Sequence, residues 1–308
     1  GKTSTAAIKT DGTLWAWGKN ENGQLAAGLA HDAHRSSPIQ IGSDTTWSKV
    51  FNGDNTTLAI KTDGTLWAWG SNTGGMLAQN ERGWNPASGA VGGRSSPTQI
   101  PGTTWSTIGV FSNGWHGIKT DGTLWACGRN DNGALGDSTK TYRSSPVQVG
   151  SGTDWSVTRG GYYAHAAAIK TDGTLWSWGY NSNGNLGQNN RTEYESPVQV
   201  PGTNWSKLAG GNQGLAAVKT DGTLWGWGMN YRGDLAQNNT VQYSSPVQIS
   251  GTTWSSVSTG QRSQGVKTDG TFWTWGFNNY GALGQNNETN YSSPVQIPGT
   301  NWSTNFAT

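Results

Sequence analysis

The sequence predicts an all-β fold, a single six-bladed β-propeller over residues 1–308 with four antiparallel strands per blade. A decapeptide close to KTDGTLWAWG occurs six times. Its copies are about fifty residues apart, a period typical of propellers and solenoids. Four short apolar segments fill each period, which is the strand number of a propeller blade. Neither end shows the polar-faced cap that a solenoid would need, so we expect a ring that the two termini close.

Each copy of the decapeptide is predicted to be a β-hairpin. Its tip is an Asp-Gly pair, such as Asp11-Gly12, which favours a type I′ turn because both central positions need a positive φ. The outgoing strand alternates tryptophan on one face with leucine and alanine on the other. Since both faces are apolar, we expect the sheet to be covered on both sides. The hairpins are predicted at residues 6–18, 58–70, 116–128, 167–179, 216–228 and 264–276.

Three further segments complete each unit. An Asn-x-x-Gly turn follows the hairpin, then a Ser-Pro strand such as Ser145–Val149, and then a Trp-Ser strand such as the one that begins at Trp155. A glycine-bearing return loop leads to the next hairpin. The phase stays open at this point, because a blade can begin at any of the four strands.

Tryptophan supplies much of the expected core. The chain has 19 Trp, and each unit places two on the hairpin and one at the start of the Trp-Ser strand, except that Cys127 stands where other units have Trp17 or Trp178. A large aromatic side chain buries about 150–250 Å² and can fill the space between blades. We therefore interpret these tryptophans as framework and Cys127 as a small buried thiol.

The composition excludes several classes of protein. Charged residues make up 12% of the chain and the net charge is +2, so there is no basic stripe of the kind that follows nucleic acid. The many tryptophans argue against disorder, and no apolar run approaches the ~18 residues of a membrane span. We expect no nucleic-acid partner and no membrane insertion. The first residue, Gly1, is not a methionine, which favours membership of a larger chain.

The motifs together resemble a known repeat. A hairpin that ends in Trp-Gly is followed by Asn-x-x-Gly-x-Leu-Gly, at 130–136, 181–187 and 278–284, and then by Ser-Pro-x-Gln-Val/Ile. This order is similar to the regulator of chromosome condensation repeat, and the resemblance covers essentially the whole chain. It implies a propeller, commonly of seven blades, whereas this sequence shows six units. It also implies functions as diverse as nucleotide exchange on a nuclear GTPase, β-lactamase inhibition, ultraviolet sensing and scaffolding, so the fold does not choose among them.

No catalytic constellation stands out in the sequence. His31 and His34 flank Asp32, but they lie in a Gly/Ala-rich loop without the second ligand pair of a zinc site. The Asp-Gly-Thr tips lack the alternating acids of a calcium loop, and the Gly-Gly pairs precede no helix and no Lys-Ser/Thr of a phosphate loop. We expect no enzyme, no cofactor and no metal.

Binding residues are expected where the repeats differ, because a scaffold varies its loops. One variable set is the return loop before each hairpin, and the other lies between the Asn-x-x-Gly turn and the Ser-Pro strand, where the second unit has an insertion. Aromatic and arginine side chains in these loops are typical of binding surfaces. The candidate residues are Arg82, Trp84 and Asn85 in the insertion and Phe111, Trp115, His116, Arg159, Tyr162, Tyr163, His165 and Arg262 in the return loops.

Two functional hypotheses follow from different classes. The first is a non-catalytic binding or structural module that contacts another protein or a surface glycan, with self-assembly as an open alternative. Its low charge and its Asn-, Thr-, Gly- and Ser-rich surface favour an extracellular, cell-surface or virion location. The second is an exchange factor for a small GTPase, which needs an acidic or wedge-like insertion. The one long insertion, around Trp84, is not acidic.

Overall fold

The computed structural model describes residues 3–26, 28, 33–81, 83, 93–212 and 214–302. These residues form antiparallel β-sheets and two short 3-10 turns, η1 (Thr73–Gly75) and η2 (Asn279–Gly281). The chain has two compact units. Unit 1 comprises Gly1–Asp131 and Leu135–Trp155, and unit 2 comprises Asn132–Ala134 and Ser156–Thr308. No helix in the described part of the chain is long and apolar enough to span a membrane.

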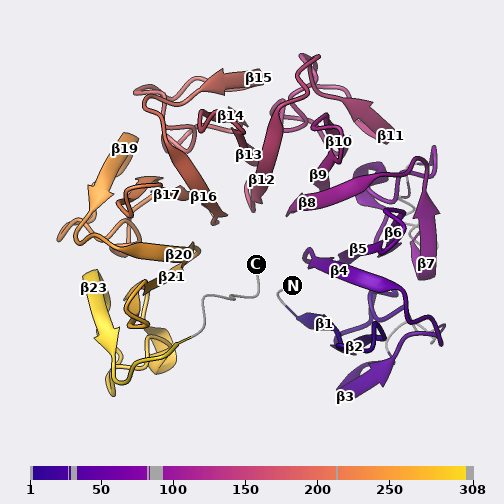
Figure 1. Ribbon diagram of the computed structural model, residues 1–308, viewed down its shortest axis with the longest axis horizontal. Coiled ribbons are helices and arrows are strands. Elements are labelled where there is room, and N and C mark those ends of the chain that lie inside the picture. Colours follow the sequence, from indigo (N-terminus) through magenta and orange to yellow (C-terminus); the bar gives the residue numbers. More distant parts are fainter. Residues whose placement is uncertain are drawn as a thin grey trace. The chain divides into compact units, whose positions relative to one another are not determined.

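Unit 1 carries three sheets, in which sequence neighbours pair (Figure 1). The first sheet has the described strands β1 (Ser4–Ile8), β2 (Leu14–Gly18) and β3 (Arg35–Gln40). The second has β4 (Trp47–Asn52), β5 (Thr56–Lys61), β6 (Leu66–Gly70) and β7 (Arg94–Ile100). The third has β8 (Trp105–Phe111), β9 (Gly114–Lys119), β10 (Leu124–Gly128) and β11 (Arg143–Gln148).

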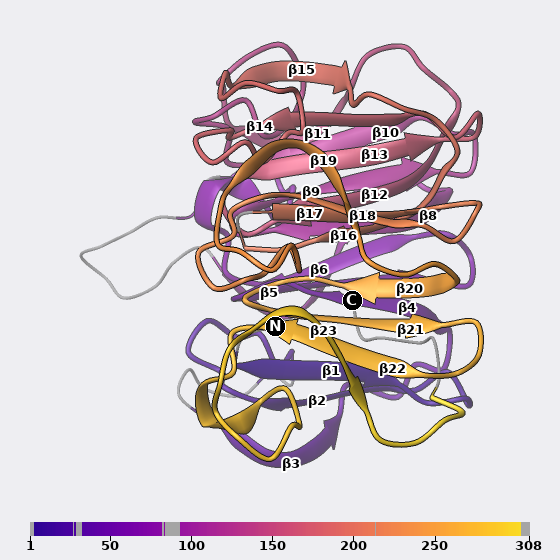
Figure 2. The same cartoon turned by 90° about the vertical axis from the view of Figure 1, so that its left-hand side faces the viewer.

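Unit 2 repeats the same arrangement three times, again with sequence neighbours paired in each sheet (Figure 2). The fourth sheet has β12 (Trp155–Gly161), β13 (His165–Lys170), β14 (Leu175–Gly179) and β15 (Tyr194–Gln199). The fifth has β16 (Trp205–Gly210), β17 (Gly214–Lys219), β18 (Leu224–Gly228) and β19 (Tyr243–Ile249). The sixth has β20 (Trp254–Ser258), β21 (Arg262–Lys267), β22 (Phe272–Gly276) and β23 (Tyr291–Ile297).

The sheets settle the phase of the repeat. Every four-stranded sheet begins with the Trp-Ser strand and ends with the Ser-Pro strand, so a blade starts at the tryptophan. The first sheet has three described strands, and a Trp-Ser segment at Trp302 follows the last blade. The residues from Ser303 onward lie outside the described part of the chain. Closure of a ring by the two termini therefore stays a prediction.

The hairpin tips differ from the predicted type I′ turn. The amide of Gly12 donates to the carbonyl of Lys9 at 2.9 Å, the amide of Lys9 donates to the carbonyl of Thr13 at 2.9 Å, and only Gly12 has a positive φ, of 80°. This is a three-residue loop, a type I turn followed by a left-handed glycine. The carboxylate of Asp11 accepts from the Thr13 amide at 3.0 Å and from its hydroxyl at 2.6 Å. These bonds hold Asp11 in a right-handed conformation, so the type I′ prediction is wrong.

Both faces of the sheets are covered, as predicted. In β6, Leu66 and Ala68 on one face and Trp69 on the other are fully buried. Trp47 meets Trp67 and Trp69 edge to face, with ring centroids 6.1 and 6.2 Å apart. The Ser-Pro strand is an outer edge of its sheet, and its proline lacks an N–H, which limits pairing with another chain.

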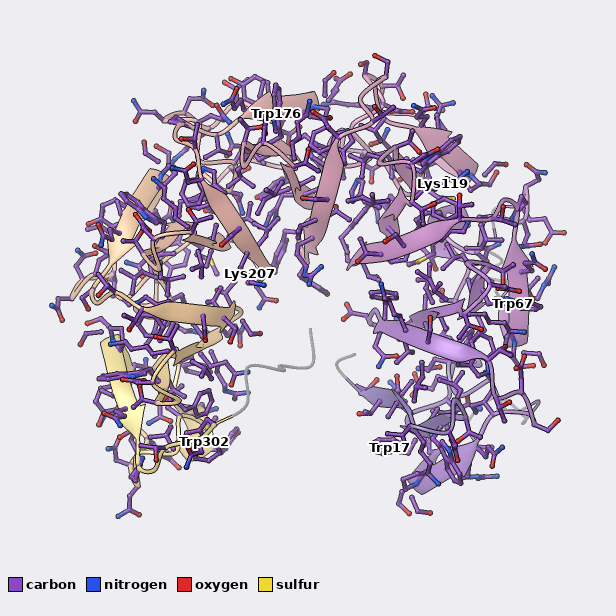
Figure 3. All side chains as sticks on the ribbon, viewed as in Figure 1. Trp17, Trp67, Lys119, Trp176, Lys207 and Trp302 are labelled. Carbon is purple, nitrogen blue, oxygen red and sulfur yellow. The ribbon has the colours of Figure 1, made fainter. Side chains whose placement is uncertain are left out.

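The hairpin lysines lie on tryptophan rings rather than on the neighbouring aspartates. The Lys61 ammonium is 4.2 Å from the Trp67 ring centroid and 4.9 Å from that of Trp47, and its carboxylate partner is Asp44, at 2.5 Å. Hydrogen bonds from Thr65, more than the charge of Lys61, lower the pKa of Asp63. Figure 3 labels Trp67, Lys119 and Trp176, which belong to this recurrent cluster in three different sheets. Lys61 and Asp63 of one hairpin thus have different main partners, Trp67 with Asp44 for the lysine and Thr65 for the aspartate.

Candidate binding surface

The two variable loop sets lie at the same end of each sheet. Since neighbouring strands are antiparallel, the loop between the first and second strands and the turn after the third strand share one end, which we call the loop end. The hairpin tips share the other end. Within unit 2 the loops of adjacent sheets are joined, because the amides of Tyr162 and Tyr163 donate to the carbonyls of Gly211 and Asn212 at 3.0 and 3.2 Å.

A buried asparagine shapes the turn after the third strand in every repeat. In the fifth sheet, the Asn230 side chain accepts from the Leu235 amide at 2.8 Å and donates to the carbonyls of Asn239 and Val241 at 3.0 and 2.9 Å. Because this side chain lies at the base of the loop, the residues that vary around it project from a fixed support. The equivalent residues are Asn20, Asn72, Asn130, Asn181 and Asn278, all buried.

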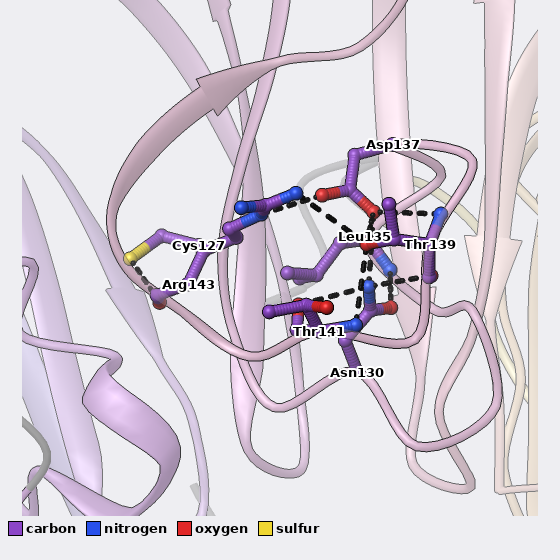
Figure 4. Close-up of polar contacts among 7 residues, drawn as sticks. All are labelled: Cys127, Asn130, Leu135, Asp137, Thr139, Thr141 and Arg143. Carbon is purple, nitrogen blue, oxygen red and sulfur yellow. Dashed lines mark hydrogen bonds and ion pairs between the residues drawn. The ribbon is translucent and has the colours of Figure 1, made fainter.

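The third sheet adds an ion pair to the same support. Asn130 accepts from the Leu135 amide at 2.8 Å and donates to Asp137 at 3.0 Å, while Arg143 pairs with Asp137 at 2.6 Å (Figure 4). In the fifth sheet, the place of the carboxylate is taken by Asn239, which donates to the Tyr243 hydroxyl at 3.0 Å. The third sheet, in unit 1, therefore fixes this loop with charges and the fifth, in unit 2, with amides and tyrosine.

An aromatic cluster occupies the loop end of unit 2. Tyr162 and Tyr163 meet edge to face with centroids 5.1 Å apart, and Tyr163 lies 6.4 Å from Tyr180. Further along, the Arg232 guanidinium lies 3.9 Å from the Phe277 ring centroid. Tyr163 and Tyr231 are 44% and 63% exposed, which is unusual for side chains of this size. We call the following residues the aromatic surface: Tyr162, Tyr163, Tyr180, Tyr231, Arg232 and Phe277.

Tyr280 lies in the corresponding turn of the sixth sheet. It is 84% exposed and has a φ of 62°, a conformation that bulky side chains seldom adopt. A tyrosine held in this region costs free energy, and such positions are enriched at functional sites.

The same positions in unit 1 carry small or charged residues. The residue after Trp-Gly is Tyr180, Met229 or Phe277 in unit 2, but Lys19, Ser71 or Arg129 in unit 1. Two of these charges are neutralised beside the turn: Lys19 pairs with Glu21 at 2.7 Å, and Arg129 pairs with Asp131. The loop end of unit 1 is therefore polar and internally paired.

Trp115 belongs to the core, which corrects its interpretation as an exposed contact. It is fully buried, and its indole N–H donates to the carbonyl of Met76 at 2.8 Å. Trp69 donates in the same way to Gln24, at 3.0 Å. Trp115 is the cross-strand partner of Cys127, so an indole on the second strand replaces the one missing from the third. The thiol is buried as predicted, and burial raises its pKa.

Several other candidate residues are buried too. Phe111 and His116 have almost no exposure and stack with centroids 5.1 Å apart, so neither is available at the surface. His165 is fully enclosed and lies over Gly161, and desolvation lowers the pKa of its imidazole to about 4. Burial also lowers the pKa of the Arg159 guanidinium. These side chains support the loop end rather than form its outer surface.

Of the remaining candidates, Arg262, Tyr162 and Tyr163 lie at the loop end of unit 2, with Arg262 and Tyr163 exposed. Arg82, Trp84 and Asn85 lie outside the described residues. The sequence interpretation missed Tyr180, Tyr231, Arg232, Phe277 and Tyr280, because they lie in or beside a turn that looked like framework. The sequence did contain a signal for Tyr231, Arg232 and Tyr280, because the residue types at the two x positions of Asn-x-x-Gly differ from repeat to repeat.

Among the described residues, no group of three or more His, Cys, Asp or Glu side chains is placed to hold a metal ion. One acid in unit 2 is unusual. Asp234 is buried, one of its carboxylate oxygens has no hydrogen-bond partner, and desolvation raises its pKa to about 6. Its backbone carbonyl accepts the Trp275 indole N–H at 2.9 Å, so its main chain has a packing role.

Comparison with curated proteins shows distant relatives that share part of their length. The chain is 27% identical over 204 residues to the ultraviolet-B receptor UVR8 of Arabidopsis thaliana, which covers 65% of this chain and 44% of the receptor. It is 25% identical over 228 residues to the human E3 ubiquitin-protein ligase HERC2, covering 68% of this chain and 4% of the ligase. The chain thus spans less than half the length of these relatives.

Solved structures show the same fold. Prp20p from Saccharomyces cerevisiae matches with a TM-score of 0.82 at 18% identity, over 97% of this chain and 75% of that one. Human WBSCR16 matches with a TM-score of 0.80 at 18% identity, over 97% and 80%. At this identity, the likeness concerns the fold alone and supports a β-propeller.

The family model gives the clearest assignment. The regulator of chromosome condensation (RCC1) repeat matches residues 11–60, 121–161, 172–218, 221–263 and 269–307, and a second model of the same repeat matches 47–75. These ranges extend through both units and include the hairpins, the Asn-x-x-Gly turns and the Ser-Pro strands described above. The chain belongs to the RCC1 repeat family of β-propellers.

Proposed function

We propose that this propeller is a non-catalytic module that binds another protein through the aromatic surface of unit 2. The observation that carries the proposal is the exposure of Tyr163, which meets Tyr162 edge to face, and of Tyr231, which precedes the Arg232 that lies over Phe277. Tyrosine and arginine dominate the energetic centres of protein interfaces, because they bury much area at little conformational cost. Two related structures fit this role, since yeast Prp20p has been studied for its binding to Gsp1p and histones and solved bound to Kap60.

The non-catalytic part of the proposal is supported by the state of the reactive groups. The Cys127 thiol and the His165 imidazole are buried, and burial favours the neutral form of both. A nucleophile or general base has to reach its substrate. We also propose an extracellular, cell-surface or virion location, which the low charge and the amide- and hydroxyl-rich surface support. Labelling of intact cells or particles with a membrane-impermeant reagent tests it, and exclusion of the label would contradict it.

A photo-crosslinking experiment tests the binding surface. A benzophenone amino acid replaces Tyr231 in one variant and Thr252 in another; Thr252 is exposed at the opposite end of the same unit. We expect a discrete protein adduct from position 231 and none from 252. The crosslinked protein is then purified and titrated against wild type and Tyr231→Ala, for which we expect about tenfold weaker binding. Equal crosslinking at both positions, or unchanged affinity, would contradict the proposal.

Two other outcomes would support the alternative functions, nucleotide exchange or glycan binding. Faster release of labelled GDP from a small GTPase would favour the exchange-factor hypothesis over a scaffold. Retention on a glycan array, lost in Tyr163→Ala and Tyr231→Ala, would replace the protein partner by a surface glycan.

A further inference from the structure

We propose that the partner segment recognised by the aromatic surface is acidic, that is, an extended stretch rich in Asp and Glu. This inference rests on the proposed binding function and specifies its chemistry. It comes from arginine side chains at the loop end of unit 2 that form no ion pair with a described carboxylate.

Three exposed arginines, Arg191, Arg232 and Arg262, lie at this end with the half-buried Arg159 beside them, and none forms an ion pair with a described carboxylate. Arg232 stacks on Phe277, Arg191 donates to the Gln242 side chain at 3.1 Å, and Arg159 donates to the carbonyl of Thr158 at 2.8 Å. The Nε of Arg159 is buried without a hydrogen-bond partner, and Arg262 is exposed at the start of β21. A guanidinium presents a planar fork of donors that matches a carboxylate, so unpaired arginines favour an anionic ligand.

Unit 1 provides the internal comparison. Three of its loop-end arginines are paired with acids, Arg94 with Glu81 at 3.2 Å, Arg143 with Asp137 at 2.6 Å, and Arg129 with Asp131, while Arg35 donates to the carbonyl of His34 at 3.0 Å. The same fold can therefore supply a carboxylate for an arginine at this end.

Acidic side chains also lie at the loop end of unit 2. Glu193 accepts from the Asn132 amide group at 2.9 Å, Glu195 is half-buried in β15, and burial raises the pKa of Asp234 more than the nearby charge of Arg232 lowers it. Glu288 lies in the exposed turn before β23. The tyrosines add hydroxyl donors, which can also bond to carboxylates. The exposed part of the surface is therefore rich in arginine and tyrosine donors.

A protein segment fits these features better than a nucleic acid. Binding to a phosphate backbone depends on many Lys and Arg contacts along a stripe. The described loop end of unit 2 carries arginine but no lysine, and the whole chain has a net charge of only +2. A few fork-shaped donors set among tyrosines favour a short acidic peptide.

The probe is a fluorescein-labelled peptide in which Asp and Glu alternate with Gly and Pro, and the control is its Asn/Gln isostere. Binding to the full chain is followed by fluorescence anisotropy at about 50 and about 200 mM salt, where screening differs. We expect the acidic peptide to bind at least tenfold more tightly than the isostere and to weaken at the higher salt. No binding of the acidic peptide at about 1 mM would overturn the inference.

Arginine variants test which side chains bind the acidic peptide. Arg232→Gln and Arg262→Gln are each expected to weaken binding about tenfold, and Arg232→Lys by less, because lysine keeps the charge but loses the fork. Arg129→Gln removes the same charge from unit 1 and should change the affinity by less than about twofold. An equal effect of Arg129→Gln would show a non-specific charge effect and overturn the inference, as would tighter binding of a single-stranded oligonucleotide with the same arginine dependence.

The outcome also separates this inference from the proposed function. If the isostere binds as well as the acidic peptide and Tyr231→Ala abolishes both, then the aromatic surface binds protein but not through acidic chemistry. If position 231 yields no crosslinked protein, the proposed function itself fails, whatever the peptides do.

Discussion

The loop ends of the two units have the same support and different surfaces. In both, a buried asparagine such as Asn130 or Asn230 bonds to the turn that follows it. In unit 1 the turns carry paired charges such as Lys19 with Glu21, whereas in unit 2 they carry exposed tyrosine and unpaired arginine. The repeated framework therefore positions these residues but does not determine whether they are charged, polar or aromatic. Each prediction below either breaks that framework or changes one of the two surfaces.

The largest effect is expected from breaking the framework shared by both units. In Gly12→Val a side chain would have to adopt a φ of 80°, and its Cβ would lie 1.9 Å from the carbonyl oxygen of Thr45. We expect a loss of about 3 kcal/mol or more in the free energy of unfolding. Urea denaturation measures it. The matched control is Gly150→Ala, which has a positive φ but no atom within 4 Å of the new Cβ, and it should cost about 1 kcal/mol. An unchanged midpoint for Gly12→Val would contradict the turn assignment.

The next largest effect on stability is expected in the third sheet, where Trp115 on the second strand replaces the indole that Cys127 lacks on the third strand. Cys127→Trp overfills a site that Trp115 already occupies, and Trp115→Thr empties it, so each should lose about 3 kcal/mol. The double variant Cys127→Trp/Trp115→Thr restores the arrangement of Thr57 and Trp69 in the second sheet and should recover most of the loss. A double-mutant cycle in denaturant measures the coupling. Additive losses would show that the two positions do not share one indole site.

A stabilisation at lower pH is expected from one buried acid in unit 2. The pKa of Asp234 is raised to about 6 by burial, so the folded protein holds this proton more tightly than the unfolded chain. The free energy of unfolding should therefore rise as the pH falls from about 6 towards the ordinary carboxyl value. Asp234→Asn should remove this dependence and stabilise the protein by about 1–2 kcal/mol at pH 7. Asn185 already occupies the equivalent place in the preceding repeat, with its oxygen accepting from the Asn183 amide at 3.1 Å.

Thermal unfolding between pH 4 and 7 checks this effect against the hairpin acids. Hydrogen bonds from Thr223 lower the pKa of Asp221, and its equivalents behave alike, so their contribution is lost only below the ordinary carboxyl range. The pH range in which Asp234 changes the stability therefore lies above the range in which the hairpin acids change it. A pH profile of Asp234→Asn parallel to that of the wild type would contradict the assignment.

The smallest effect on stability is expected at the surface itself. Tyr231 is largely exposed, so Tyr231→Ala should change the free energy of unfolding by less than about 0.5 kcal/mol while weakening partner binding about tenfold. Calorimetric unfolding and titration on the same sample separate the two quantities. A large loss of stability would show that Tyr231 is framework, as Trp115 proved to be.

Sequence alone predicts most of the framework, because spacing and alternation determine which residues face the core. The six hairpins, the covered faces of β6 and the buried thiol of Cys127 all follow from such patterns. The type I′ turn does not hold, because side-chain bonds from Thr13 to Asp11 outweigh the local preference of an Asp-Gly pair. The phase of the blades needed strand pairing, which composition does not encode.

The candidate surface was harder to predict. Trp115 looked like an extra aromatic in a loop, but its role depends on Cys127 across the hairpin, a contact between residues twelve positions apart. Tyr231 and Arg232 looked like part of a turn motif, and their exposure depends on the buried Asn230 beneath them. Burial is a property of the folded arrangement, so variation between repeats identifies candidates but cannot separate surface from core.

The measurement that tests the account most directly is the affinity of the crosslinked partner for matched variants of the two loop ends. Tyr163→Ala and Tyr231→Ala change unit 2, and Lys19→Ala and Arg129→Ala change the corresponding end of unit 1. Titration calorimetry should show about tenfold weaker binding for each unit 2 variant and less than about twofold change for each unit 1 variant. Equal losses from both units would contradict the claim that one framework carries a binding surface in unit 2 and a self-paired surface in unit 1.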